Sequence, residues 1–406
     1  MHRRQSGFTL VVLLVILGIA GVLLAARLAE GVSDQERAQR ELAVMGQIRD
    51  ALIARAAADE SRPGSLPCPD MDNDGIADGS TCTSPYVGRL PWKTLDLPEP
   101  RDASGEPFWY AISMPYRDTS AAGVLNSDTA GTLTVNDAGG NPVASDIVAV
   151  IFAPRAPLSG QNRNPSDAAS LINRSNYLEG ENATSAGADT LFQHQVETNT
   201  FNDFALPITR AMLMRAVEHR VARQARRCLM DYAAAQGHLP FAAPMADTAN
   251  YLEQSGLLYG RVPKTVLAGA WPDDRLQIPT SGSSWMGTEQ CFGASLWWDN
   301  WRELLLYRVA SPNTQLPTGS CPADCLFVNG SSSAEAVVIV AGKALTSPVN
   351  QTFRSTNKTL PQYYLEAISG INNATGLASS RTFAKAATTA SFNDRLECIG
   401  APAACN

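Results

Sequence analysis

Hydrophobic positions are distributed unevenly along the chain, and the longest apolar run lies near its start. No charged residue occurs from Phe8 to Ala26, and Arg3 and Arg4 precede this run. As a helix, with a rise of ~1.5 Å per residue, the run is long enough to cross the ~30 Å apolar core of a bilayer. The basic residues predict that its short N-terminal side stays in the cytoplasm and that the bulk of the chain is exported. A cleaved secretory signal, processed within LLAARLAEG, is the alternative.

After Arg27 the pattern becomes that of an amphipathic helix. Apolar side chains recur at steps of three and four residues, at Leu42, Met45, Ile48, Leu52 and Ile53. Ser33 or Asp34 can cap the start of this helix, and the segment SRPGSLP is expected to end it. The helix is expected to continue outward from the apolar run as a spine.

Six short sequence patterns then occur twice in the same order, with offsets between 172 and 197 residues. The pairs are GSLP at 64 and GHLP at 237, YVGRLPWKTL at 86 and LYGRVPKTVL at 258, DASGEPFWYAI at 102 and DNWRELLLYRV at 299, DIVAVIFAP at 146 and EAVVIVAGK at 335, NYLEG at 176 and YYLEA at 363, and TFNDF at 200 and SFNDR at 391. Chance does not readily produce six matches in one order, so we infer an internal duplication.

Each copy combines a helix with short strands. The apolar runs IVAVIFA and AVVIVA, one in each copy, are short and β-branched, which favours strands over helices. The second copy's helix follows Phe204 and has no apolar run long enough to cross a membrane. The sequence therefore predicts an α+β fold, in which a long N-terminal transmembrane or spine helix is followed by two tandem modules, each a helix plus an antiparallel sheet.

Composition and charge narrow the functional classes. The 406-residue chain has 45% hydrophobic and 17% charged residues and a net charge of -7. This is the composition of a globular protein, and the stripe of Lys and Arg that neutralises phosphates is missing, so no nucleic-acid partner is expected. The sequence has no Gly-x-Ser-x-Gly elbow, His-Glu-x-x-His pair or phosphate-binding glycine loop. We therefore expect that the protein is not an enzyme.

The chain has eight cysteines, and most of them form close pairs along the sequence. The close pairs are Cys68 with Cys82, Cys321 with Cys325, and Cys398 with Cys405, which leaves Cys228 and Cys291. Short zinc-binding knuckles and neighbouring histidines are missing. Disulfides formed in an oxidising compartment fit this pattern better than a zinc site does, with free buried thiols as the alternative.

The segment CPDMDNDGIADGSTC, from Cys68 to Cys82, combines alternating carboxylates with a glycine. Its spacing matches part of a calcium-binding loop, with candidate ligands at Asp70, Asp72, Asp74, Asp78 and the backbone carbonyl of Ile76. Hard carboxylate oxygens suit Ca²⁺ better than a transition metal, and the carboxylates would repel one another without a cation. A disulfide between the flanking cysteines would lower the entropy lost on binding. A solvated turn rich in Asp is the alternative, and the second copy has no such loop.

A cluster of tryptophans in the segment LWWDNW has two interpretations. The three side chains are Trp297, Trp298 and Trp301. They either pack in the core beneath the second sheet or form an exposed patch that binds a substrate or a surface.

The start of the chain, RRQSGFTLVVLL, resembles the prepilin-type signal of type IV pilins and type II secretion pseudopilins. The resemblance covers about the first thirty residues and rests on the order of basic charge, Gly, Phe, Thr, Leu and apolar run. It implies that prepilin peptidase cleaves after Gly7, that the new N-terminal Phe8 is N-methylated, and that the apolar helix is retained. It also implies that the two modules are pilin-like, that Cys398 and Cys405 pin the C-terminus, and that any metal is structural.

The resulting division of the chain is a leader at 1–7, a transmembrane or filament helix at 8–30, a first module with the Asp-rich loop at 31–207, and a second module without an anchor at 208–406. The expected location is the bacterial inner membrane, with a single pass, a cytoplasmic N-terminus and a periplasmic bulk, or the outside of the cell within a filament. The expected partners are other pilins or pseudopilins, prepilin peptidase and the membrane.

One position departs from the family's pattern. The fifth mature residue is usually Glu, and here it is Val12. In the family this carboxylate is thought to neutralise the N-terminal ammonium of the subunit ahead, which matters because an unpaired charge in a bilayer is costly. Its absence suggests a minor pilin or pseudopilin at or near the filament tip, with a weakly incorporated subunit elsewhere in the filament as the other interpretation of this position. The alternative is a membrane-anchored binding protein, either an adhesin or a receptor for secreted substrates.

Overall fold

The computed structural model of the chain describes residues 35–79, 82, 86–119, 122–184, 191–264, 296–310, 325–330 and 332–400. The predicted leader at 1–7 and apolar helix at 8–30 lie outside these ranges.

The predicted α+β fold class with antiparallel sheets is wrong in the pairing of its strands. Within the described ranges the first helix, α1, spans residues 35–58, and no helix there is both long and apolar enough to cross a membrane. The sheets are mixed rather than antiparallel, because β3 (Leu133–Asn136) pairs in parallel with β5 (Leu191–Gln193), and β9 (Leu326–Val328) does so with β14 (Thr382–Phe383). Strands of two to four residues are too short for a hydropathy pattern to reveal. The fold is a mixed α/β arrangement around a curled sheet.

The first sheet is built around one long strand, β4 (Pro142–Ala153). Its C-terminal half lies between β2 (Trp109–Ile112) and β6 (Phe204–Thr209), and β1 (Val87–Arg89) extends the sheet beyond β2. Its N-terminal half pairs with β3, which carries β5 on its far side. The register between β3 and β4 shifts around Asp146, which has a φ of +58°. This bulge bends β4 and curls the sheet.

The second sheet repeats the strand order of the first. Its order is β15 (Arg395–Ile399), β11 (Ala336–Val340), β8 (Leu305–Val309) and β7 (Tyr259–Arg261). β10 (Ser332–Ala334) and β11 together take the place of β4, and Glu335 separates them where β4 has its bulge. β9 and β14 then stand where β3 and β5 stand in the first sheet. This repeat of topology is the structural counterpart of the repeat in the sequence.

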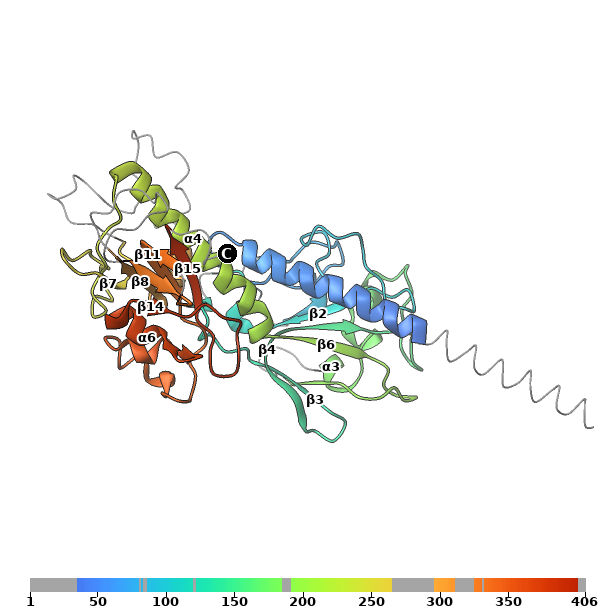
Figure 1. Ribbon diagram of the computed structural model, residues 1–406. Helices are drawn as coiled ribbons and strands as arrows, with labels where there is room; N and C mark the ends of the chain where they lie inside the picture. The colour runs from blue at the N-terminus through green and yellow to red at the C-terminus, as the bar shows by residue number, and fades with distance from the viewer. Residues whose placement is uncertain are drawn as a thin grey trace, which may run out of the picture.

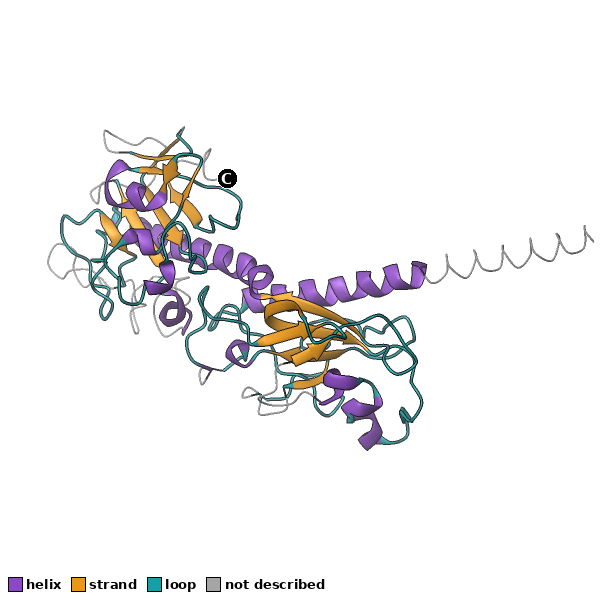
Figure 2. Cartoon of the chain, turned by 90° about the horizontal axis from the view of Figure 1, so that it is seen from below, coloured by secondary structure: helices purple, strands orange, loops and turns teal. Residues whose placement is uncertain are grey.

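Two long helices cover the sheets, as Figure 1 shows. α1 lies along the first sheet, and α4 (Arg210–Gln236) runs from the first sheet to the second. α4 begins directly after β6, because the Thr209 side chain caps it by accepting the Met212 N–H, and it ends at the left-handed Gly237. Buried side chains of α1, α4 and both sheets form one continuous hydrophobic cluster. The two modules therefore share a core, although Figure 2 shows them as separate lobes.

The remaining elements are short. They are η1 (Met114–Tyr116), α2 (Ala168–Ile172), η3 (Arg174–Asn176), α3 (Gly180–Thr184), α5 (Leu296–Trp301), η4 (Gln351–Phe353), η5 (Pro361–Tyr363), β12 (Ala367–Ile368), β13 (Ile371–Asn372), α6 (Asn373–Thr375) and η6 (Gly376–Ser380).

The bulge in β4 places a carboxylate at the junction of the two modules. Asp146 accepts hydrogen bonds from the Gly131 N–H at 2.9 Å, from Arg210 Nη2 at 2.6 Å and from Lys343 Nζ at 3.1 Å. Burial alone would raise the pKa of Asp146, but the Gly131 N–H and the Arg210 guanidinium outweigh it and lower the pKa. Asp146 therefore ties the start of α4 and a loop of the second module to the first sheet.

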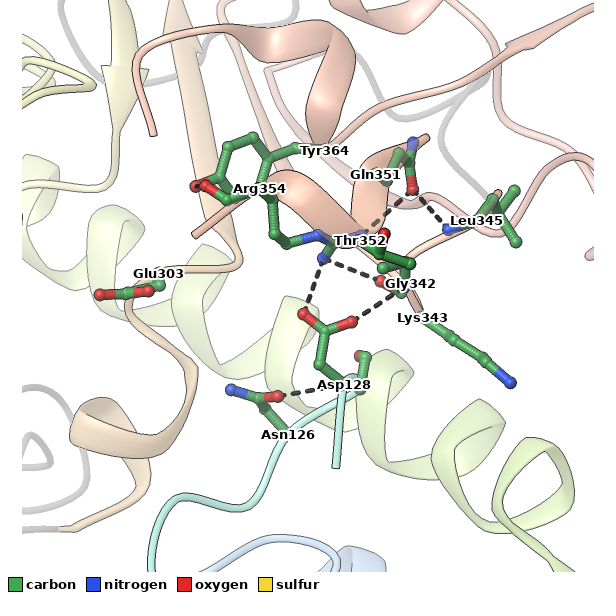
Figure 3. A network of polar contacts seen from close by, with 12 residues as sticks. Asn126, Asp128, Glu303, Gly342, Lys343, Leu345, Gln351, Thr352, Arg354 and Tyr364 are labelled. Atoms are coloured by element: carbon green, nitrogen blue, oxygen red, sulfur yellow. Dashed lines mark hydrogen bonds and ion pairs between the residues drawn. The ribbon is translucent and has the colours of Figure 1, made fainter. Parts of the chain in front are cut away.

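Figure 3 shows a second contact between the modules, which Asp128 makes. Asp128 pairs with the buried Arg354 at 3.2 Å and accepts the Ala344 N–H at 2.9 Å. The neighbouring loop also meets α5, because the Asn300 side chain accepts the Leu125 N–H at 2.7 Å. These contacts fix the orientation of the second module on the first.

Replacing the junction carboxylate should destabilise the whole chain. We expect Asp146→Ala to lower the free energy of unfolding by about 2 kcal/mol, because it leaves the buried Arg210 without its counter-charge. Since the pKa of Asp146 is lowered, its contribution is present above the ordinary pKa of 3.8 and is lost as the pH falls through the lowered value. Urea unfolding at pH 7 and pH 3 measures both effects. The control is Glu36→Ala, which removes the exposed pair with Arg40 and should change stability by less than about 0.5 kcal/mol; equal losses in both variants would contradict the assignment.

Candidate metal centre

The Asp-rich segment forms a closed loop at the edge of the first sheet. The structure contains the predicted disulfide between Cys68 and Cys82, whose Cα atoms are 5.4 Å apart. At the start of the loop, the backbone of Asp70 exchanges two hydrogen bonds with Arg89 in β1, at 3.0 and 2.8 Å. The loop is therefore tied at both ends, by a covalent bond and by pairing with a strand.

The other predicted disulfide residues divide into two groups. Cys228, Cys325 and Cys398 are each disulfide-bonded. Cys291, Cys321 and Cys405 lie outside the described residues, so the pairings proposed for them remain predictions.

Asp70 organises the loop from the inside. Its carboxylate is buried, and it accepts the N–H of Asn73 at 2.6 Å and that of Gly75 at 2.7 Å. Both donors have a positive φ, +69° and +86°, which turns the chain around the carboxylate. A Cβ at position 75 would lie 2.7 Å from the Trp92 ring, so only glycine fits this turn.

Three of the predicted ligands come together. One carboxylate oxygen each from Asp70, Asp72 and Asp78 lies within 4.8 Å of the others. With a Ca²⁺–O distance of ~2.4 Å, two ligands on opposite sides of the ion are ~4.8 Å apart, so these oxygens can reach a common centre. Asp78 also accepts the Met71 N–H, which draws the end of the loop back over its start.

Asp74 is not part of this cluster, and the backbone carbonyl of Ile76 remains a predicted ligand. Asp74 accepts the Ile76 N–H at 2.7 Å through its side chain, and its own backbone carbonyl accepts a hydrogen bond from Lys93. The side chain of Ile76 is exposed. The segment after β1 braces this half of the loop, because Thr94 Oγ1 accepts the Ala77 N–H at 2.9 Å. The spacing of the aspartates carries no signal for Lys93 or Thr94, which follow 15 residues or more after the last predicted ligand.

The electrostatics of the cluster favour a bound cation. Burial raises the pKa of Asp70, and the neighbouring charge of Asp72 adds to this, while the N–H groups of the loop oppose it. Three carboxylates this close repel one another, and a divalent ion would remove that repulsion. The donors are all hard oxygens, which suits Ca²⁺ or Mg²⁺ rather than zinc. A cation held here would stabilise the loop, because it would join Asp70 and Asp72 at the start of the loop to Asp78 near its end.

The tryptophan cluster and the processing site were also predicted from the sequence. Trp297, Trp298 and Trp301 are each at most 1% exposed, so the idea of an exposed binding patch is wrong. They belong to the shared hydrophobic core, where Tyr251 meets the Trp298 ring edge-on at 5.6 Å between centroids. Gly7 and Phe8, the predicted processing site, lie outside the described residues.

Comparison of the chain with protein-family models, with curated proteins and with solved structures finds no match. The interpretation of the loop therefore rests on its own geometry.

Two aspartates of the loop form a matched pair for a test. Asp72 and Asp74 are both exposed, and each accepts the N–H two residues further on, but only Asp72 belongs to the cluster. We expect Asp72→Asn to weaken Ca²⁺ binding by about 10–100-fold and Asp74→Asn by much less, because a lost ligand costs at least as much as a lost outer-sphere partner. Isothermal titration calorimetry with CaCl₂ measures both. Equal effects would contradict the three-residue cluster, and no heat of binding in the unaltered chain would favour the solvated turn.

Proposed function

We propose that the chain is a non-catalytic minor subunit of a filament, either a minor pilin of a type IV pilus or a pseudopilin of a type II secretion system. The observation that carries the proposal is the N-terminal order of basic residues, Gly7, Phe8 and an uninterrupted apolar run. In this proposal prepilin peptidase removes the leader at the inner membrane, and the apolar segment then packs among the corresponding segments of other subunits.

The position of α1 supports this role. Figure 1 shows its N-terminal end at the edge of the molecule, beyond the strands of the first sheet. Residues 35–40 are exposed, and the first buried contact of α1 is the ion pair of Glu41 with Arg155, at 2.7 Å. The segment before α1 can therefore engage a membrane or other subunits without disturbing the core of the head.

A place at or near the tip follows from Val12. A subunit without the usual carboxylate cannot neutralise the N-terminal ammonium of a subunit ahead of it, and a tip subunit has none ahead. The shared core and the fixed junction also suit this position, because a rigid double head transmits force without separating. The candidate calcium site would then stabilise the head that lies closer to the membrane segment.

The tryptophan cluster no longer supports the alternative of a binding protein. Exposed tryptophans would have favoured that hypothesis, and Trp297, Trp298 and Trp301 are buried. The filament proposal does not depend on them.

The processing site can be tested with a matched pair of glycine substitutions. We expect the unaltered chain and Gly21→Ala, a change within the apolar run, to yield a mature protein that begins with N-methylated Phe8. Gly7→Ala should retain the leader and remain outside filaments, because the residue before the cleaved bond is altered. Mass spectrometry of the N-terminal peptide from membranes and from sheared filaments gives the answer. A mature start at Met1 or near Ala29 in the unaltered chain would overturn the proposal.

A further inference from the structure

Each module contains a buried pair of carboxyl groups at the same position of its fold. The first pair is Glu179 with Asp203, and the second is Glu366 with Asp394. Glu179 directly precedes the short helix α3, whereas Glu366 directly precedes β12, and β12 and β13 lie between it and α6. The Asp of each pair directly precedes the last strand of its sheet, β6 or β15. All four side chains are at most 9% exposed, so neither pair is screened by solvent.

The Glu carboxylate of each pair receives hydrogen bonds from N–H donors on both of its oxygens. Glu179 Oε2 accepts the Asn202 N–H at 3.0 Å, and its Oε1 accepts Gln161 Nε2 at 2.6 Å. The second module repeats this. Glu366 Oε2 accepts the Asn393 N–H at 2.8 Å, and its Oε1 accepts Gln351 Nε2 at 2.7 Å. This surrounding of donors fits an ionised Glu.

The orientation of the two glutamines is fixed by their other contacts. Gln161 Oε1 accepts the Leu158 N–H at 2.9 Å and Arg163 Nη2 at 2.7 Å, so its amide nitrogen must point at Glu179. Gln351 Oε1 likewise accepts the Leu345 N–H at 3.0 Å and Arg354 Nη2 at 3.1 Å. Neither amide can turn its oxygen toward the Glu without losing two donors.

The Asp of each pair has one satisfied oxygen and one that meets no donor. Asp203 Oδ2 accepts the Glu179 N–H at 2.8 Å and Asn182 Nδ2 at 3.2 Å. Asp394 Oδ2 accepts the Glu366 N–H at 3.1 Å and Asn373 Nδ2 at 2.8 Å. Oδ1 of both residues is buried without a donor. Each Asp carboxyl lies within hydrogen-bonding reach of the Glu carboxyl beside it.

We propose that each module is locked by one proton, carried on Oδ1 of Asp203 or Asp394 and donated to the adjacent Glu carboxylate, and that loss of these protons loosens the modules. Protonation converts the orphaned Oδ1 into a donor and leaves one negative charge per pair instead of two. An unprotonated pair would hold two like charges out of water, and one oxygen would lack any donor. Burial, followed by the charge of Glu179, raises the pKa of Asp203 to about 9, and burial and Glu366 raise that of Asp394 as well.

The charged groups around the two pairs differ. In the first module Arg163 lies behind Gln161, and Glu179 is the main charge acting on Asp203. In the second, Arg354 favours the ionised form of Glu366, whereas Glu366 and Glu218 of α4 repel each other.

The second pair also connects to the junction between the modules. Gln351 holds Glu366 through its nitrogen and Arg354 through its oxygen, and Arg354 forms the ion pair with Asp128 of the first module (Figure 3). Asn393, next to Asp394, donates to the carbonyl of Lys343, whose ammonium binds Asp146. A second charge on this pair would therefore disturb the side chains that hold the modules together.

The sign of the pH dependence follows from the raised pKa. Between the ordinary pKa of 3.8 and the raised value of about 9, the folded chain keeps a proton at Asp203 that the unfolded chain has released. The contribution to stability is therefore complete at low pH and is lost as the pH rises across this window. As the pH rises across this window, the folding equilibrium constant falls by up to about tenfold per pH unit for each proton that the folded chain holds.

The test uses unfolding of the full chain by urea between pH 6 and pH 8. We expect the double variant Asp203→Asn, Asp394→Asn to remain folded, because the Asn amide nitrogen replaces the protonated Oδ1 as the donor to Glu. As the pH rises, the folding equilibrium constant of the unaltered chain should fall by up to about 100-fold per pH unit, because two protons are lost. The folding equilibrium constant of the double variant should fall less steeply. Glu179→Gln and Glu366→Gln are the matched controls, and they should lose stability at every pH because an amide nitrogen would face the fixed donors. An unchanged pH slope in the double variant would overturn the proposal.

A measurement on the unaltered chain keeps the proposal testable if a variant fails to fold. Infrared spectroscopy at pH 7 should show the carbonyl stretch of protonated carboxylic acids, and this band should disappear as the pH is raised and the modules loosen. Each single variant, Asp203→Asn or Asp394→Asn, should remove part of the band. A folded chain at pH 7 without any protonated-carboxyl band would overturn the shared proton.

Discussion

The direct continuation of β6 into α4 is the constraint on which the rest of the structure depends. Thr209 is both the last residue of the strand and the cap of the helix, so no linker separates the two sheets. α4 covers the second sheet, but its first turn remains bound to the first module, where Arg210 contacts Asp146 and the carbonyl of Ser127. Because one rigid helix belongs to both modules, their cores merge, and the contact of Asp128 with Arg354 can form only in one orientation.

Strands with a continuous apolar run could be predicted from the sequence. Elements that depend on pairing between distant segments could not. The runs IVAVIFA and AVVIVA became β4 and β11, because a buried strand needs consecutive apolar, β-branched side chains. Parallel pairing of β3 with β5 joins residues more than 50 positions apart, and the sequence of either short strand does not indicate which strand it pairs with. The bulge at Asp146 had a trace in the sequence, since an acidic residue precedes the apolar run in both copies, but only the structure shows that this residue bends the strand.

The sequence predicts which loop contains the candidate metal site, but it does not predict which of the aspartates in that loop come together. Alternating aspartates at equal spacing look alike in the sequence, whereas the turn at Asn73 and Gly75 directs Asp72 and Asp78 toward Asp70. Asp74 is drawn aside by its contacts with Ile76 and by the approach of Lys93, which comes from another segment. The sequence left the location of the tryptophans open for a related reason. Their spacing of one and three residues fits a helical turn, but what covers that turn, including Tyr251, lies some 45 residues earlier in the chain.

The repeated segments YLE and FND contain the Glu and the Asp of the two buried carboxyl pairs. Their contacts show why both copies can keep a pair that is costly to bury. Each Glu is surrounded by donors whose orientation other contacts fix, so a neutral residue at that position would leave N–H groups unpaired. Each Asp must then supply a donor as well as an acceptor, and an aspartic acid does so only with its proton in place. In the second module the same glutamine, Gln351, binds both Glu366 and Arg354. The charge of the Glu366–Asp394 pair and the ion pair that joins the modules therefore both act on Gln351. The protonation state of this one acid pair thus affects the contacts between the modules.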